Sequence, residues 1–111
     1  HCSTRRFWEP EFPGSDLNLA GWTKKITGKP CIAVGSISLD QDFIDEEKRN
    51  IGTHAKPASL RNLEDLLARG DFDLVAVGRS LIPNPDWPKL IAAGHESELR
   101  AYDKSDLDTL V

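Results

Sequence analysis

Methionine is absent from this sequence of 111 residues, which opens on His1, and cysteine occurs only twice, at Cys2 and Cys31. The absence of an initiator residue leads us to expect either a fragment of a longer protein or a broken gene model. The two cysteines lie far apart and form no Cys-x-x-Cys pair, so we expect reduced thiols rather than a disulfide framework. The histidines at positions 1, 54 and 95 have no spacing typical of zinc ligands, and we expect no metal site.

Long apolar runs and an excess of positive charge are also missing. The longest apolar stretches, such as residues 31–34 and 74–77, are far shorter than the ~20 residues of a membrane-spanning helix. No apolar segment typical of a secretory signal follows the first residues, so we expect a cytoplasmic protein without a membrane partner. The net charge of −4 argues against a nucleic-acid partner, because binding of phosphate backbones requires a strongly basic surface.

The motifs of several common enzyme classes are missing as well. The sequence contains no Gly-x-Ser-x-Gly elbow, no Walker sequence and no Gly-x-Gly-x-x-Gly fingerprint. These absences weaken interpretations of the chain as a hydrolase, a P-loop protein or a nicotinamide-binding Rossmann domain.

Two short apolar runs predict neighbouring strands of a parallel sheet. Residues 31–34 and 74–77 are continuously apolar rather than alternating, and each run ends directly in a glycine. Such runs are typical of strands buried on both faces beneath helices. Between them, residues 59–70 place four leucines on one helical face, with Ser59 as the predicted N-cap and Gly70 just beyond the helix end. The pattern therefore predicts a strand–helix–strand unit.

Further helices and one loop are predicted around this unit. Residues 17–27 predict a helix closed by Gly28, and residues 85–93 predict another, capped by Asn84 and stopped by Gly94. The charged tail is expected to hold a short helix around residues 98–102. Residues 40–57 show little periodicity and predict an exposed loop with one helical turn, in which the charged run 45–49 is a solvated face. This alternation of strands and helices fits either an open sheet or a closed barrel.

The two glycine turns are the best candidates for chemistry. In (β/α)8 barrels, the loops after the seventh and eighth strands often form a phosphate site with the N-terminus of a short extra helix. Gly35 and Gly78 would let backbone N–H groups approach phosphate oxygens, and Arg79 would add a guanidinium fork suited to phosphate. From spacing alone, an equally good interpretation is that the glycines merely permit tight turns and that Arg79 is a solvated surface residue.

The segment at the second turn favours the first interpretation. Residues 77–87 read VGRSLIPNPDW and closely resemble the segment VGR-x-L-x-x-(D/N)-P-(D/E)-W near the C-terminus of the NADH:flavin oxidoreductase family, the relatives of old yellow enzyme. Residues 5–12 and 14–25 resemble the family's segment after strand six, and residues 35–37 match its glycine turn after strand seven. The resemblance implies that residues 1–111 are the C-terminal part of an FMN-binding TIM barrel, from the end of strand six through helix eight and the tail. The expected fold class is α/β, with an incomplete (β/α)8 barrel in this chain.

The resemblance also implies an activity. The implied protein is an FMN-dependent NAD(P)H oxidoreductase of the ene-reductase type, which passes hydride from NAD(P)H through the flavin to a small electrophilic alkene. The residues implied to bind the FMN phosphate come from the two turns: Gly35, Ser36, Gly78 and Arg79. Phe7 and Trp8, after strand six, are implied to line the mouth of the active site.

Other functions remain open from the sequence. No segment matches the family's substrate-orienting His/Asn or His/His pair or its tyrosine proton donor, so no catalytic residue is assigned, and Tyr102 is expected to serve packing. The chain could instead be a non-catalytic barrel fragment that binds phosphate or assembles with a partner, or part of another phosphate-binding barrel enzyme. A complete barrel takes ~250 residues. We therefore expect the isolated chain to expose apolar faces that the missing units would cover. Such a chain should be marginally stable, should self-associate, or should need the missing half of the barrel.

Overall fold

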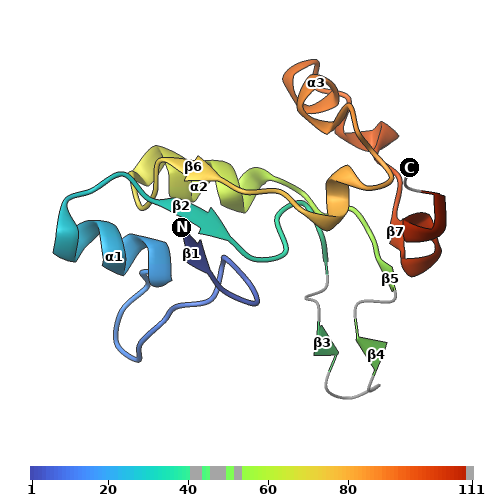
Figure 1. Cartoon of the computed structure of the whole chain (residues 1–111). Coiled ribbons are helices and arrows are strands. Elements are labelled where there is room, and N and C mark those ends of the chain that lie inside the picture. The colour runs from blue at the N-terminus through green and yellow to red at the C-terminus, as the bar shows by residue number, and fades with distance from the viewer. Residues whose placement is uncertain (41–43, 46–49, 52–53, 110–111) are drawn as a thin grey trace.

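A parallel sheet of three short strands organises the computed structural model of the chain (Figure 1). The structure describes residues 1–40, 44–45, 50–51 and 54–109. The strands lie in the order β1-β2-β6, and both neighbouring pairs run parallel, with bounds β1 (Cys2–Ser3), β2 (Ile32–Val34) and β6 (Leu74–Val75). The predicted α/β arrangement, in which the two apolar runs pair in parallel, is confirmed.

Three α-helices connect and follow these strands, with bounds α1 (Leu19–Thr27), α2 (Arg61–Arg69) and α3 (Trp87–Ala92). The predicted closing glycines are confirmed, because Gly28 and Gly70 adopt φ values of 65° and 83°, a left-handed conformation that other residues avoid. The leucine face of α2 packs on the core as predicted, with Leu63 fully buried. In the described part of the chain, no helix is long and apolar enough to cross a membrane.

The predicted starts of two helices need correction. Leu60 rather than Ser59 occupies the N-cap position of α2, although the Ser59 hydroxyl accepts a hydrogen bond from the Arg61 N–H at 3.2 Å. The N-cap position of α3 is held by Asp86, and its side chain makes no capping bond. Asn84 is buried, and its side chain bonds the Ser80 and Arg100 backbones instead of capping the helix.

The region after β2 and the C-terminal tail differ most from the predictions. The described residues of the range 40–57 form strands rather than a helical turn: β3 (Ile44–Asp45), β4 (Asn50–Ile51) and β5 (His54–Ala55). Most of the charged run 45–49 lies outside the described residues. The helix expected at 98–102 is wrong, because strand β7 (Tyr102–Asp103) pairs antiparallel with β5 after a 3-10 turn at Glu96–Glu98. Figure 1 shows β5 and β7 beyond the carboxyl ends of the parallel strands.

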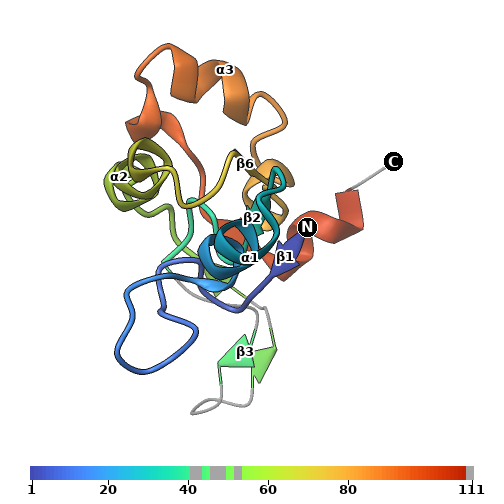
Figure 2. The same cartoon turned by 90° about the vertical axis from the view of Figure 1, so that its left-hand side faces the viewer.

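Burial of the parallel strands is less complete than expected. Leu74 of β6 is 59% exposed, although the apolar run predicted a strand buried on both faces. The reason is position, since β6 lies at one edge of the described sheet. Figure 2 shows α2 and the C-terminal 3-10 helix η3 (Lys104–Thr109) on opposite sides of the strands. The main core cluster includes Phe72 and Ala33. A second cluster joins Leu39 to Ala55 of β5 and Tyr102 of β7.

Asp73 ties the start of β6 to α1 and to β2. Its carboxylate bonds the Lys24 ammonium at 2.8 Å and accepts a hydrogen bond from the Cys31 N–H at 2.8 Å. These two donors, the Lys24 bond first, lower the pKa of the Asp73 carboxyl below its ordinary value. A carboxylate whose pKa is lowered on folding stabilises the fold above its unfolded pKa, and that stabilisation is lost as the pH falls through the folded value.

We therefore expect Asp73→Asn to lower the free energy of unfolding at neutral pH and to have a shrinking effect as the pH falls below ~4. The measurement is urea unfolding of both proteins across the acid range. Asp65→Asn, at an exposed position of α2, is the matched control and should leave the pH profile of the parent unchanged. An Asp73→Asn protein whose stability follows the parent at every pH would contradict this role.

Candidate functional site

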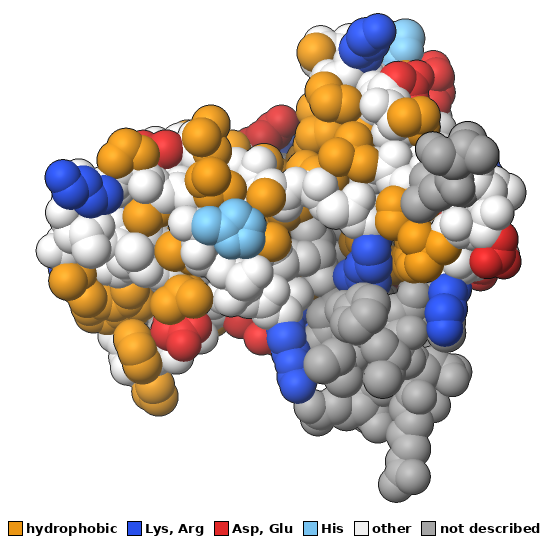
Figure 3. Space-filling model, in the orientation of Figure 1, with side chains coloured by type: hydrophobic (Ala, Val, Ile, Leu, Met, Phe, Trp, Pro, Cys, Tyr) orange, Lys and Arg blue, Asp and Glu red, His pale blue; other side chains and the backbone are white. Residues whose placement is uncertain are grey.

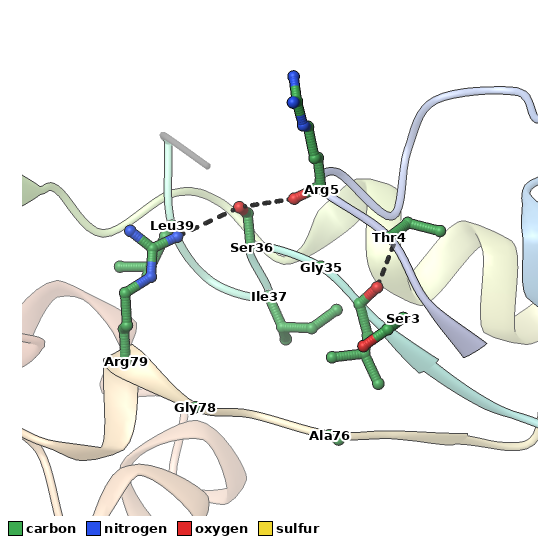
Figure 4. A pocket seen from close by; sticks show the side chains of 11 residues that line it. Ser3, Thr4, Arg5, Gly35, Ser36, Ile37, Leu39, Ala76, Gly78 and Arg79 are labelled. Carbon is green, nitrogen blue, oxygen red and sulfur yellow. Dashed lines mark hydrogen bonds between the residues drawn. The ribbon is translucent and has the colours of Figure 1, made fainter. Parts of the chain in front are cut away.

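The loops that follow β1, β2 and β6 meet around one pocket at the carboxyl ends of the parallel strands (Figure 4). Its volume is about 460 Å3. Its lining contains two arginines and no acidic side chain among the described residues: Ser3, Thr4, Arg5, Val34, Gly35, Ser36, Ile37, Leu39, Ala76, Gly78 and Arg79. Figure 3 shows the molecular surface hollowed between the part that carries α1 and the part that carries α3. An arginine guanidinium at the lining is a group that can bind an anionic ligand.

Gly35 is required by a close contact between two of these loops. Its φ is 142°, and a Cβ atom placed on it would lie 2.6 Å from both the carbonyl oxygen and the hydroxyl oxygen of Thr4. Hydrogen bonds hold the contact from both sides: the Thr4 N–H donates to the Val34 carbonyl at 3.0 Å, and the Phe7 N–H donates to the Gly35 carbonyl at 3.1 Å. The first glycine turn therefore fixes the loop after β1 against the end of β2.

Gly78 has a different surrounding. An added Cβ would find no atom within 4 Å, so the space beside this residue is open. The chain continues directly into a single 3-10 turn, η1 (Arg79–Leu81), whose Leu81 N–H bonds the Gly78 carbonyl at 2.9 Å. The α-helix predicted over residues 85–93 begins only at Trp87 and ends at Ala92, so it does not directly follow this turn.

Ser36 and Arg79 join the two turns across the pocket. Ser36 adopts a φ of 51°, its hydroxyl donates to the Arg5 carbonyl at 3.0 Å, and an Arg79 guanidinium nitrogen lies 3.4 Å from the same hydroxyl oxygen. Figure 4 shows the Arg79 side chain directed towards Ser36, whereas the Arg5 side chain points away. The structure thus brings all four predicted turn residues, Gly35, Ser36, Gly78 and Arg79, to one pocket.

Backbone donors are available at the same place. Within the described part of the chain, neither the Gly35 N–H nor the Gly78 N–H donates a hydrogen bond. Backbone N–H groups and a guanidinium around one small volume are donors that proteins use for phosphate and carboxylate groups. The arrangement can bind an oxyanion, and it offers no carboxylate or imidazole within the described lining that would move a proton.

Two side chains that the sequence did not connect with the pocket support Arg79. The Tyr102 ring lies under the Arg79 guanidinium, with 5.8 Å between the guanidinium carbon and the ring centroid. Asn84 bonds the Ser80 carbonyl at 2.9 Å, and it exchanges two hydrogen bonds with the Arg100 backbone at 2.8 and 3.0 Å. Tyr102 serves packing, as expected, but its packing partner is a pocket residue. No local pattern could have shown this, because the contacts join distant parts of the chain.

Phe7 and Trp8 do not line the glycine pocket. Phe7 is buried in the main core and packs edge-to-face against Trp8, with 5.2 Å between the ring centroids. Both rings border a second pocket of about 270 Å3, which shares Ser36 and Leu39 with the first. Their expected place at the mouth of an active site stays a prediction.

The two cysteines are free, as the sequence predicted, and both are buried. Burial is the main cause that raises the pKa of the Cys31 thiol, and the neighbouring Cys2 adds to it. A thiol whose pKa is raised in this way is a poor nucleophile. Among the residues that the structure describes, no group of three or more His, Cys, Asp or Glu side chains could hold a metal ion.

Comparison with known proteins gives one informative similarity. No protein-family model matches the chain. The chain is 49% identical over 87 residues to the NADH oxidase of Thermoanaerobacter brockii, a match that covers 78% of this chain and 10% of that protein. The chain thus spans about a tenth of the length of the curated relative that it matches. The similarity covers most of the present chain and relates it to one part of a much larger oxidoreductase.

Proposed function

We propose that this chain is the phosphate-binding part of an FMN-dependent NAD(P)H oxidoreductase of the ene-reductase type, related to old yellow enzyme. The observation that carries the proposal is the meeting of two glycine turns, from adjacent parallel strands, around one pocket with Arg79 at its edge. The similarity to an NADH oxidase supports an oxidoreductase that uses a nicotinamide reductant. When bound, FMN would supply hydride transfer between NAD(P)H and an activated alkene.

The residues at the pocket fit a phosphate group. The open space beside Gly78 leaves room for phosphate oxygens close to the backbone, which a side chain at this position would fill. The Arg79 guanidinium would hold the dianion, and the N–H groups of Gly35 and Gly78 would add donors. These residues bind and orient the phosphate end, and none of them is assigned a role in proton transfer.

The proposal extends to the fold. In the described sheet, β1 and β6 are edge strands that each pair only with β2, and Leu74 of β6 is exposed. Edges of this kind are closed in a barrel by further strands. We take residues 1–111 as the last βα units of a (β/α)8 barrel in a cytoplasmic enzyme, whose remaining units, from a longer chain or a partner, would cover these edges.

The test is a comparison of FMN with riboflavin, which has the same isoalloxazine ring and no phosphate. We expect the purified chain to quench FMN fluorescence saturably, to bind riboflavin at least about tenfold more weakly, and to lose FMN when inorganic phosphate is added. NAD(P)H-dependent reduction of a cyclic enone by the same preparation then tests turnover.

The outcomes separate the candidate functions. Binding of FMN without turnover would favour a non-catalytic barrel fragment over a complete enzyme. Equal binding of many phosphate monoesters, with no preference for FMN, would favour another phosphate-binding barrel enzyme. Equal affinities for FMN and riboflavin, or no saturable binding of either, would contradict the proposal.

A further inference from the structure

The Tyr102 ring is held rigidly at the end of the chain. It is 3% exposed and lies in a cluster with Leu39 and Ala55, against which Ile82 also packs. Strand β7 places Tyr102 directly opposite Ala55 of β5 in an antiparallel pair. An aromatic ring enclosed in this way has little rotational freedom, so it offers a fixed surface to whatever lies against it.

Asn84 fastens this part of the tail to the turn that carries Arg79. It is 4% exposed and joins the Ser80 carbonyl to both backbone groups of Arg100 through the three hydrogen bonds described above. The anchored segment begins two positions before Tyr102, and Ser80 directly follows Arg79. The position of the ring relative to the arginine is therefore fixed by two independent contacts, the β5–β7 pair and the Asn84 bonds.

The Arg79 guanidinium lies between the ring and Ser36. It is 5.8 Å from the ring centroid and 3.4 Å from the Ser36 hydroxyl. A free arginine side chain samples many rotamers, and ordering it costs conformational entropy. An aromatic face that attracts the cation restricts those rotamers before any anion binds. The arginine side chain therefore loses less conformational entropy when the anion binds.

We infer that Tyr102 is a positioning residue for the anion pocket: its ring holds the Arg79 guanidinium in the orientation that receives a phosphate group. The inference rests on the proposed function, and it adds that phosphate affinity depends on the C-terminal strand β7. Tyr102 touches no ligand in this role and acts only through Arg79.

The experiment measures FMN and riboflavin binding by the full chain with three substitutions. Tyr102→Phe keeps the ring and should bind FMN like the parent, whereas Tyr102→Leu should bind FMN about three- to tenfold more weakly. Ile82→Ala is the matched control, because it removes packing from the same cluster without touching the contact with the guanidinium. It should lower the unfolding temperature and leave FMN affinity unchanged.

Two further measurements keep the inference testable if Tyr102→Leu folds poorly. Replacement of Tyr102 by fluorinated phenylalanines removes electron density from the ring at nearly constant size, so FMN affinity should fall with each added fluorine. In an Arg79→Lys background, Tyr102→Leu should weaken FMN binding less than in the parent, since coupled residues are not additive.

The possible results separate the positioning role from the proposed function. A parent chain that binds FMN no better than riboflavin would contradict the proposed function itself. A parent that prefers FMN, with an affinity unchanged by Tyr102→Leu and by fluorination, would overturn the positioning role alone. An equal loss of affinity in Ile82→Ala and Tyr102→Leu would overturn it too, because packing would then explain both effects.

Discussion

Replacing Arg79 by alanine is expected to weaken FMN binding by about 10- to 100-fold and to leave the binding of riboflavin unchanged. The guanidinium is the permanent cation that the structure directs across the pocket, with its nitrogen 3.4 Å from the Ser36 hydroxyl. Charge-assisted hydrogen bonds to phosphate are about twice as strong as neutral ones, and riboflavin has no phosphate to receive them. The measurement is parallel fluorescence titration with the two flavins.

Two variants decide whether charge or geometry matters at this position. Arg79→Lys keeps the charge but loses the planar fork, so its FMN affinity should lie between those of the parent and the alanine variant. Arg61→Ala removes the same charge from an exposed position at the start of α2, and it should bind FMN like the parent. If Arg61→Ala bound FMN as weakly as Arg79→Ala, the loss of affinity would come from the change in net charge. That result would contradict binding of the FMN phosphate at this pocket.

Gly35→Ala is expected to destabilise the fold by about 3–5 kcal/mol, more than the same substitution at Gly14 or Gly78. Two penalties combine. The φ of 142° is unfavourable for any side chain, and the new Cβ would lie 2.6 Å from the Thr4 carbonyl oxygen, a backbone atom that cannot rotate away. Relief of the clash would move the loop after β1 away from β2. Urea unfolding of parent and variant measures the loss.

Substitutions at the other two glycines separate these penalties. Gly14 has a φ of 80° with no atom near its Cβ position, so Gly14→Ala carries the conformational penalty alone, about 1 kcal/mol. At Gly78 an added Cβ meets no atom within 4 Å, so Gly78→Ala carries no clash penalty; it should destabilise the fold less than Gly35→Ala and yet weaken FMN binding. A stable Gly35→Ala protein would show that the Thr4 contact is not required.

Local sequence patterns predicted the elements that local physics controls. Gly28 and Gly70 end their helices because the backbone there turns left-handed, a conformation that glycine adopts without a steric penalty. The leucines of α2 share a face because of the helical period alone. The two glycine turns could be predicted because each glycine directly follows a short apolar run. The residues predicted from these turns line one pocket.

The predictions failed where distant segments meet. Tyr102 belongs to a strand because β5 pairs with it, and without that partner the local pattern favoured a helix. Asn84 had the usual identity of an N-cap, but its bonds go to Arg100 and Ser80 because burial makes those unsatisfied backbone groups more costly than exposed helix ends. Leu74 was expected to be buried, and its exposure reflects its place at a sheet edge.

The sequence by itself determined the alternation of strands and helices, the two glycine turns and the position of Arg79 directly after the second. Only the tertiary structure decided that Gly35 is needed for the Thr4 contact, that Gly78 faces open space, and that the Tyr102 ring lies against Arg79. The division has a physical reason. Backbone conformation depends on near neighbours and can be predicted from them, whereas close contacts and cation–π pairs depend on which distant segments the folded chain brings together.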